Sequence, residues 1–79
     1  MKNLDINEHI GKIYYEYRQK NNLTQSQVAE LIGVEPRHIS QIERGFSKGS
    51  IDTLIKLCNV YKITPDIVLY DLLDKVYFD

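Results

Sequence analysis

The sequence predicts an all-α fold, a compact bundle of five helices in a single domain that spans residues 1–79. Apolar residues recur at helical spacing along the chain, and no stretch alternates apolar and polar residues as a half-buried strand would. Residues typical of helix ends separate the helical segments. A chain of 79 residues can bury only one modest core, so one domain is the most that we expect.

The first helix is expected to run from about Asn7 to Asn21. Asn22 should end it, because asparagine tolerates the left-handed backbone conformation found at helix C-termini. The apolar stripe of this helix consists of Ile10, Ile13, Tyr14 and Tyr17.

The second and third helices are expected to be short. Thr24 is the expected N-cap of the second helix, Gln27 completes a capping box, and Gly33 should end the helix. Pro36 takes the first position of the third helix, where its missing N–H costs nothing, and we expect this helix to end at Gly45. The second helix should bury Val28, Ala29, Leu31 and Ile32.

The fourth helix is expected to start at Ser50 and the fifth at Thr64, with Pro65 in the first helical position. The fifth helix should continue close to the C-terminus. The fourth helix should bury Ile51, Leu54, Ile55, Leu57 and Cys58.

Composition and motifs exclude several classes of protein. No apolar run approaches the roughly 20 residues that span a bilayer, and the N-terminus lacks a signal-peptide core, so we expect a cytoplasmic protein without a membrane partner. The single cysteine, Cys58, can form neither an internal disulfide nor a cysteine-rich zinc site. His9 and His38 lie on different helices, and no phosphate-binding glycine loop or metal-binding motif occurs. We therefore expect no enzyme, and no cofactor, metal or small-molecule ligand.

The net charge of −1 at first argues against a nucleic-acid partner. The charges are unevenly distributed, however. Residues 12–62 carry eight basic and five acidic side chains, whereas residues 63–79 carry one basic and four acidic ones. The middle of the chain is mildly basic and its C-terminal end acidic, which does not decide the function by itself.

The second and third helices, joined by the turn Gly33-Val34-Glu35, have the arrangement of a helix-turn-helix over about Thr24 to Arg44. The same arrangement also fits an ordinary pair of antiparallel helices in a small bundle. Helix lengths therefore leave both interpretations open.

The outer face of the third helix carries side chains suited to DNA. If Ile39 and Ile42 face the core, at about 100° per residue the remaining sides are polar. The residues there are Arg37, Gln41 and Arg44, with Ser40 beside them and His38 on one flank. Arginine and glutamine fit base edges, and Ser40 and Arg44 are suited to phosphates. Any soluble helix also turns polar residues outward, so this face alone does not establish DNA binding.

Glu43 falls near the inward side of the third helix, between the directions of Ile39 and Ile42. A buried carboxylate needs a partner, and Arg18, at the end of the first helix, is the best candidate. Alternatively, Glu43 extends outward and is solvated.

The segments LTQSQVAELIGV at 23–34 and ISQIERG at 39–45 closely resemble the phage repressor/Cro helix-turn-helix family, also called the xenobiotic-response-element type. The resemblance extends back to Ile10-Gly11 and Arg18 and forward to residues 66–69, so it covers nearly the whole chain. The family implies a lambda-repressor-like bundle of five helices that binds operator DNA, commonly as a homodimer.

The resemblance also implies roles for individual residues. Base-contacting positions correspond to Pro36, Arg37 and Gln41, to which we add His38 on the flank of the same helix. Phosphate-contacting positions correspond to Gln25 and Lys48, to which we add Ser40 and Arg44. The internal salt bridge of the family corresponds to Arg18 and Glu43.

Four residues depart from the family pattern. Pro36 can offer a base only apolar contact, and Glu35 places a negative charge close to the expected DNA surface. Gly49 stands where proline is frequent, and Lys62 where glycine is frequent. The first two departures bear on which bases are contacted, and none of them bears on the fold.

We therefore expect a transcriptional regulator that binds double-stranded operator DNA in a sequence-specific way, a repressor that reads half-sites with its third helix in the major groove. The alternative is a protein-interaction module of the same fold that does not bind DNA, which the near-neutral charge allows.

We also expect a homodimer joined largely through the fifth helix. Its apolar stripe contains Leu69, Leu72, Leu73, Val76 and Tyr77, while Ile67, Val68 and Phe78 fall outside it. A terminal helix that packs on one small core needs a single stripe, so apolar surface remains for an interface. Alternatively, this helix only closes the core of the monomer. The expected interface residues are Leu69, Tyr70, Leu73, Val76, Tyr77 and Phe78.

Overall fold

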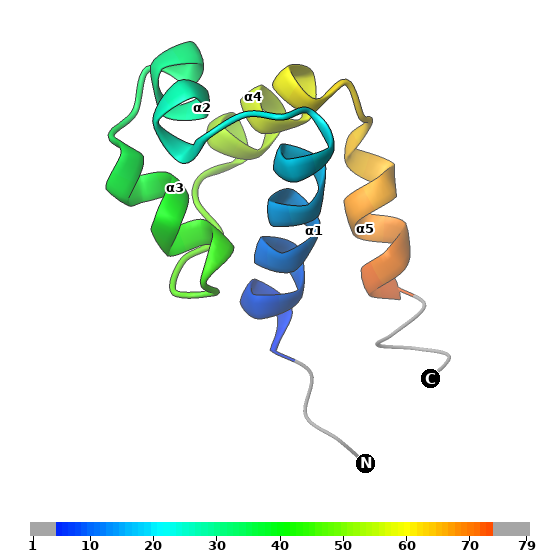
Figure 1. Ribbon diagram of the computed structural model, residues 1–79. Helices are drawn as coiled ribbons and strands as arrows, with labels where there is room; N and C mark the ends of the chain where they lie inside the picture. Colours follow the sequence, from blue (N-terminus) through cyan, green and yellow to red (C-terminus); the bar gives the residue numbers. More distant parts are fainter. Residues whose placement is uncertain (1–4, 74–79) are drawn as a thin grey trace.

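The computed structural model describes residues 5–73, with side chains as far as Tyr70. Within this range the predicted all-α fold is confirmed, with five helices and no strand. Helix α1 stands between α3 and α5, and α2 and α4 lie toward one end of the bundle (Figure 1). The helices are α1 (Ile6–Lys20), α2 (Gln25–Ile32), α3 (Pro36–Glu43), α4 (Ile51–Tyr61) and α5 (Pro65–Leu73).

Local capping sets the boundaries of α2. The predicted capping box is present, because Thr24 Oγ1 accepts from the backbone N–H of Gln27 at 3.0 Å and Gln27 Oε1 accepts from that of Thr24 at 2.8 Å. Asn22 (φ 56°) and Gly33 (φ 75°) adopt left-handed backbone conformations, in the turn after α1 and at the C-cap of α2. Both had been predicted to end a helix.

Helix α3 ends at Glu43, two residues earlier than predicted, and Arg44 is its C-cap. The predicted final residue, Gly45, has a φ of 81° and already belongs to the following loop. A glycine with positive φ commonly stands just outside a helix rather than within it. Ser50 caps the next helix by accepting a 3.2 Å hydrogen bond from the backbone N–H of Thr53.

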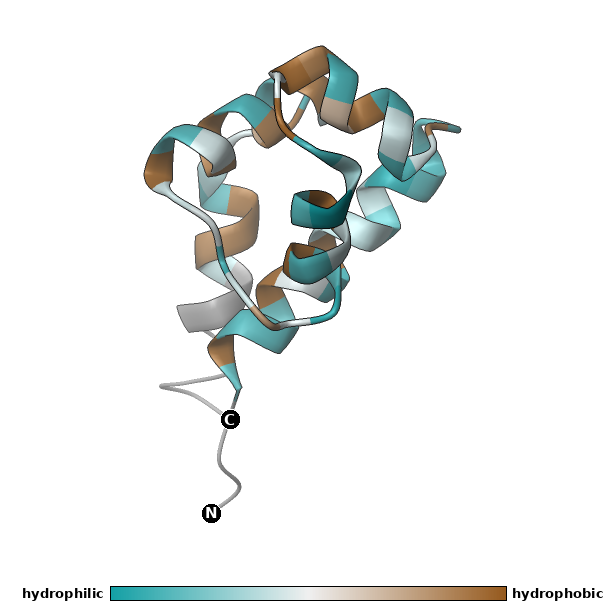
Figure 2. Cartoon of the chain, turned by 90° about the vertical axis from the view of Figure 1, so that its left-hand side faces the viewer, coloured by the Kyte–Doolittle hydropathy of each residue, from teal (hydrophilic) through white to brown (hydrophobic). Residues whose placement is uncertain are grey.

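One apolar core lies between the helices, and every helix contributes to it. Figure 2 shows apolar and polar residues interspersed along the helices, as expected of amphipathic helices. Among the described side chains, the buried apolar ones are Ile10, Tyr14, Val28, Ala29, Ile32, Ile39, Ile42, Leu57, Cys58, Tyr61 and Val68.

Three residues that we predicted to be buried are exposed: Leu31 (64%), Ile51 (74%) and Ile55 (56%). Other residues define the inner faces, namely Val28, Ala29 and Ile32 on α2 and Thr53, Leu57, Cys58 and Tyr61 on α4. At about 100° per residue, the three exposed side chains lie roughly a quarter-turn or more from those faces. The prediction was wrong here because short apolar runs include sideways positions as well as inward ones.

Helix α5 also faces the core differently from the prediction. Val68, placed outside the apolar stripe, is only 3% exposed, whereas Leu69 within the stripe is 54% exposed. The helix packs on α1 and α4, and among its side chains up to Tyr70 it is Val68 that enters the core. Because α5 is apolar on several sides, its sequence does not define a unique inward stripe.

Tyr14 connects α1 to α4 inside the core. Its hydroxyl donates to the carbonyl of Leu54 at 3.4 Å and lies 3.7 Å from Cys58 Sγ, and its ring centroid is 6.1 Å from that of Tyr61. Burial raises the pKa of both tyrosines well above the ordinary value, because a phenolate would lose its hydration there.

Candidate nucleic-acid interface

A tight turn joins α2 to α3. Gly33 closes α2 in a left-handed conformation, and the backbone N–H of Val34 donates to the carbonyl of Ala29 at 2.9 Å. Glu35 is the N-cap of α3 but makes no capping hydrogen bond with its side chain, and Pro36 follows at the start of the helix. The two helices also pack on each other, so the structure contains the predicted helix-turn-helix.

The inward side of α3 holds this helix firmly in place. Ile39 and Ile42 are each 1% exposed, as the helical register predicted. Gly11 of α1 lies directly against the end of α3, where a Cβ atom would collide with the carbonyl oxygen of Ile42 and lie 2.8 Å from that of Glu43. Only glycine lets the two backbones approach so closely, so α1 fixes the position of α3.

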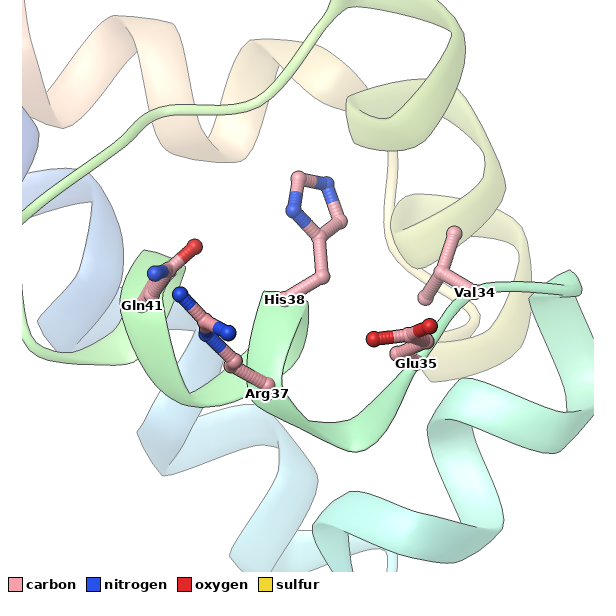
Figure 3. Close-up of a pocket in the computed structure, with 5 residues that line it drawn as sticks. All are labelled: Val34, Glu35, Arg37, His38 and Gln41. Carbon is pink, nitrogen blue, oxygen red and sulfur yellow. The ribbon is translucent and has the colours of Figure 1, made fainter.

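The outer side of α3 forms an open hollow of about 300 Å³ lined by Val34, Glu35, Arg37, His38 and Gln41. Figure 3 shows Arg37 and Gln41 near each other on the helix, with His38 beside them. Three of the predicted base-contacting residues therefore share one surface. The fourth, Pro36, is exposed at the start of the helix but does not line the hollow.

Three of the predicted phosphate-contacting residues, Gln25, Arg44 and Lys48, lie at or beyond the ends of α2 and α3, and the fourth, Ser40, lies within α3. Arg44 and Lys48 are exposed, and Ser40 is partly buried. The Arg44 guanidinium lies over the ring of Phe46, 4.6 Å from its centroid, and Phe46 is 66% exposed. This ring restricts where the guanidinium can point. Our prediction missed Phe46, although an aromatic residue in a short polar loop was a visible signal.

Arg18 and Glu43, the predicted salt-bridge partners, are in contact. Arg18 Nε donates to Glu43 Oε2 at 2.6 Å and Nη2 donates to Oε1 at 2.9 Å, a two-point geometry, and the two side chains are 9% and 4% exposed. Arg18 Nη1 also donates to the carbonyl of Leu23 at 2.9 Å. These hydrogen bonds to Glu43 raise the pKa of Arg18.

Gln25 joins the same cluster. Its amide nitrogen Nε2 donates to Glu43 Oε1 at 3.1 Å, so the first residue of α2 is bonded to the last residue of α3. The prediction assigned Gln25 only an outward role toward phosphate. The Glu43 carboxylate therefore holds the ends of three helices together.

The predicted dimer surface is only partly within the described residues. Leu69 and Tyr70 are exposed, by 54% and 73%. The side chain of Leu73 lies outside the described part, as do Val76, Tyr77 and Phe78. Beside Leu69, a hollow of about 260 Å³ opens between α4 and α5, and its lining is Ile10, Tyr14, Ile51, Leu54, Ile55, Cys58, Pro65, Val68 and Leu69.

The described residues contain neither a membrane-spanning helix nor a metal-binding cluster. No helix there is long and apolar enough to cross a membrane. No group of histidine, cysteine, aspartate and glutamate side chains in residues 5–73 is arranged to hold a metal ion.

Fold and surface together define a helix-turn-helix domain of the kind found in bacterial and phage regulators. A family model described as helix-turn-helix matches residues 15–68. The chain therefore belongs to the phage repressor/Cro-like helix-turn-helix family.

The sequence is similar to a transcriptional regulator and to a control protein. The transcriptional regulator ImmR of Bacillus subtilis (strain 168) is 37% identical over 60 residues, which are 76% of this chain and 47% of ImmR. The control protein C.SmaI of Serratia marcescens is 37% identical over 54 residues, 68% of this chain and 64% of C.SmaI. The chain thus spans about half to two thirds of the length of these relatives.

Solved structures share the fold. The clp gene regulator ClgR from Corynebacterium glutamicum superposes with a TM-score of 0.82 at 24% identity, over 95% of this chain and 79% of ClgR. The P22 c2 repressor, solved in complex with a synthetic operator, superposes with a TM-score of 0.71 at 25% identity, over 75% of this chain and 89% of that one.

Proposed function

We propose that this chain binds double-stranded operator DNA and represses transcription in the cytoplasm, acting as one domain that works by binding and not by catalysis. The observation that carries the proposal is the shared hollow on the outer side of α3, where Arg37, His38 and Gln41 lie together. Arginine donates to guanine O6 and N7, and glutamine pairs with adenine N6 and N7. Pro36, exposed beside them, can contact a thymine methyl group.

Rigid support of α3 favours this role. The helix is held from its inner side by Ile39 and Ile42, and at its end by the bond between Glu43 and Arg18. A helix anchored in this way can enter a major groove without rearrangement of the domain. The P22 c2 repressor, which shares the fold, was solved with operator DNA bound.

Phosphate contacts would come from residues around the hollow. Gln25 opens α2, where unpaired backbone N–H groups favour an anion. Ser40, Arg44 and Lys48 are the other phosphate-contacting residues that we propose. The Arg44 guanidinium is positioned by its contact with the Phe46 ring. Such contacts set the position of the protein on DNA, and the residues in the hollow select the sequence.

The test is selection of bound duplexes from a randomised library, followed by affinity measurements on the enriched sequence at several salt concentrations. We expect one motif to be enriched and its affinity to fall steeply as salt rises. Arg37→Ala should relax the preference at one base pair per half-site by about 1–3 kcal/mol.

A matched control is Lys56→Ala, which removes a positive charge from α4, where Lys56 pairs with Asp52 at 3.0 Å. This variant should keep the wild-type motif and affinity. A wild-type protein that binds no duplex even at low salt would exclude the proposal, and would favour a protein-interaction module of the same fold.

We also infer that two copies pair through α5, through the surface formed by Leu69, Tyr70, Leu73, Val76, Tyr77 and Phe78. Exposed apolar side chains support this inference. Leu69 lines one hollow together with the exposed Ile51 and Ile55 of α4, and Tyr70, the next residue of α5, is also exposed. Two-fold pairing would present two copies of α3 about 34 Å apart, the spacing of successive major grooves.

Sedimentation of the wild type and two variants tests the pairing. Leu69→Asp should give monomers at micromolar concentration, where the wild type is dimeric. Leu31→Asp is the matched control, because Leu31 is equally apolar and 64% exposed but lies on α2. A wild type that stays monomeric with and without operator would contradict the inference.

A further inference from the structure

Among the described residues, Glu35 is the one acidic side chain that lines the hollow on the outer side of α3. It is exposed, and Figure 3 shows its carboxylate at one end of the hollow and the amide of Gln41 at the other, with Arg37 between them along the helix. Phosphates repel a carboxylate on a DNA-facing surface, so this residue should weaken binding to any DNA unless it makes a favourable contact there.

Helix capping does not account for the presence of Glu35. The residue occupies the N-cap position of α3, yet its side chain makes no capping hydrogen bond. Serine, threonine, asparagine and aspartate cap helices better. Among the described residues, its carboxylate forms no hydrogen bond or ion pair. The carboxylate is therefore available to a ligand that enters the hollow.

The chemistry of the base edges selects one kind of ligand. Arginine only donates hydrogen bonds, so Arg37 cannot accept one from an exocyclic amino group, whereas an ionised carboxylate only accepts. In the major groove, cytosine presents the N4 amino donor with no acceptor of its own. Adenine presents N6 beside the acceptor N7, which would repel a carboxylate. Cytosine is thus the base that fits Glu35 best.

We propose that Glu35 is a specificity-determining residue that accepts a hydrogen bond from N4 of a cytosine in each half-site, beside the base pair read by Arg37. This proposal rests on the proposed function, because it assumes that α3 lies in a major groove. Repulsion between the carboxylate and the phosphates lowers the affinity for every DNA sequence. The hydrogen bond from a cytosine amino group offsets this loss at sequences that place cytosine beside Glu35. The contribution of Glu35 is therefore to discrimination between sequences rather than to affinity.

The experiment is selection from a randomised duplex library with the wild type, Glu35→Gln and Glu30→Gln. Glu30 is an exposed acidic residue that lines a separate hollow between α2 and α4, so its variant makes the same change of charge elsewhere. In Glu35→Gln we expect the preference for cytosine at one position per half-site to fall about tenfold, within the range of single-base discrimination. Affinity for random duplex should rise severalfold, and the other positions of the motif should stay unchanged.

Glu35→Ser is the second variant, because serine can cap α3 and should not lower the melting temperature. It should lose the same cytosine preference, while Glu30→Gln keeps it. If Glu35→Gln binds every sequence more tightly by the same factor, or shows the wild-type motif and affinities, Glu35 does not read a base. If the wild type itself enriches no sequence, the proposed function fails as a whole. An enriched motif with no change in Glu35→Gln overturns the Glu35 proposal alone.

Discussion

Replacing Glu43 by alanine should destabilise the protein by about 3–5 kcal/mol, because the change leaves Arg18 as an unpaired buried charge. Hydrogen bonds from Arg18 Nε, Arg18 Nη2 and Gln25 Nε2 all end on this carboxylate, and the Arg18 side chain is only 9% exposed. A hydrogen bond to a charged group contributes about 1.5–3 kcal/mol to stability. The loss of the three hydrogen bonds to Glu43, reduced by partial relaxation of the surrounding side chains, therefore also comes to about 3–5 kcal/mol. Small domains have total free energies of unfolding of about 5–15 kcal/mol, so this loss is a large fraction of the total stability.

Thermal and urea denaturation followed by circular dichroism measure the effect. One kcal/mol shifts the melting temperature of a domain this size by about 4–8 °C, so we expect a decrease of about 12 °C or more. Glu30→Ala, which removes an exposed carboxylate from α2, should change the melting temperature little. The double variant Arg18→Met/Glu43→Leu should recover most of the loss, because neither charge is left unpaired. A Glu43→Ala protein that melts at the wild-type temperature would refute the reasoning.

Three further outcomes can be measured. Gly11→Ala should lower the free energy of unfolding by at least about 1–3 kcal/mol, because the added methyl group must displace the backbone of α3 at Ile42. An unchanged urea midpoint would mean that α1 and α3 can move apart easily. Gln25→Ala should weaken binding to all duplexes alike, and a loss confined to one base position in binding titrations would contradict its phosphate role. Burial raises the pKa of Tyr14 and Tyr61, so their contribution to stability is fully present below the ordinary tyrosine pKa near 10 and is lost as the pH rises above it. The free energy of unfolding should fall there by up to about 1.4 kcal/mol per pH unit for each tyrosine, and Tyr14→Phe should show a shallower decrease in a pH series of denaturation curves.

Local signals made most of the fold predictable. Thr24 with Gln27, and the positive φ residues Asn22 and Gly33, act within a few residues of their own position, so their effect can be recognised in sequence. Burial was harder to predict on α4 and α5. Which side of a helix faces the core depends on the angle at which it packs, and the exposed Ile51 is as apolar as a core residue.

The candidate site also has one part that could be predicted from the sequence and one part that could not. The inward register of Ile39 and Ile42 follows from helical geometry, and it places Arg37 and Gln41 outside. The bond between Gln25 and Glu43 joins residues 18 positions apart, and it exists only because α2 and α3 cross at a particular angle. Sequence spacing does not specify such an angle, so this contact could not have been predicted.

The separation of the anchoring side of α3 from its outer side bears on how such a protein evolves. The helix is held in place by Ile39, Ile42 and Glu43, and none of these side chains lines the outer hollow. Exchanges at Glu35, Arg37 or Gln41 therefore alter exposed or half-exposed groups that folding does not require. A lineage can consequently move to a new operator by single substitutions in this hollow, and each intermediate along the way remains a folded protein.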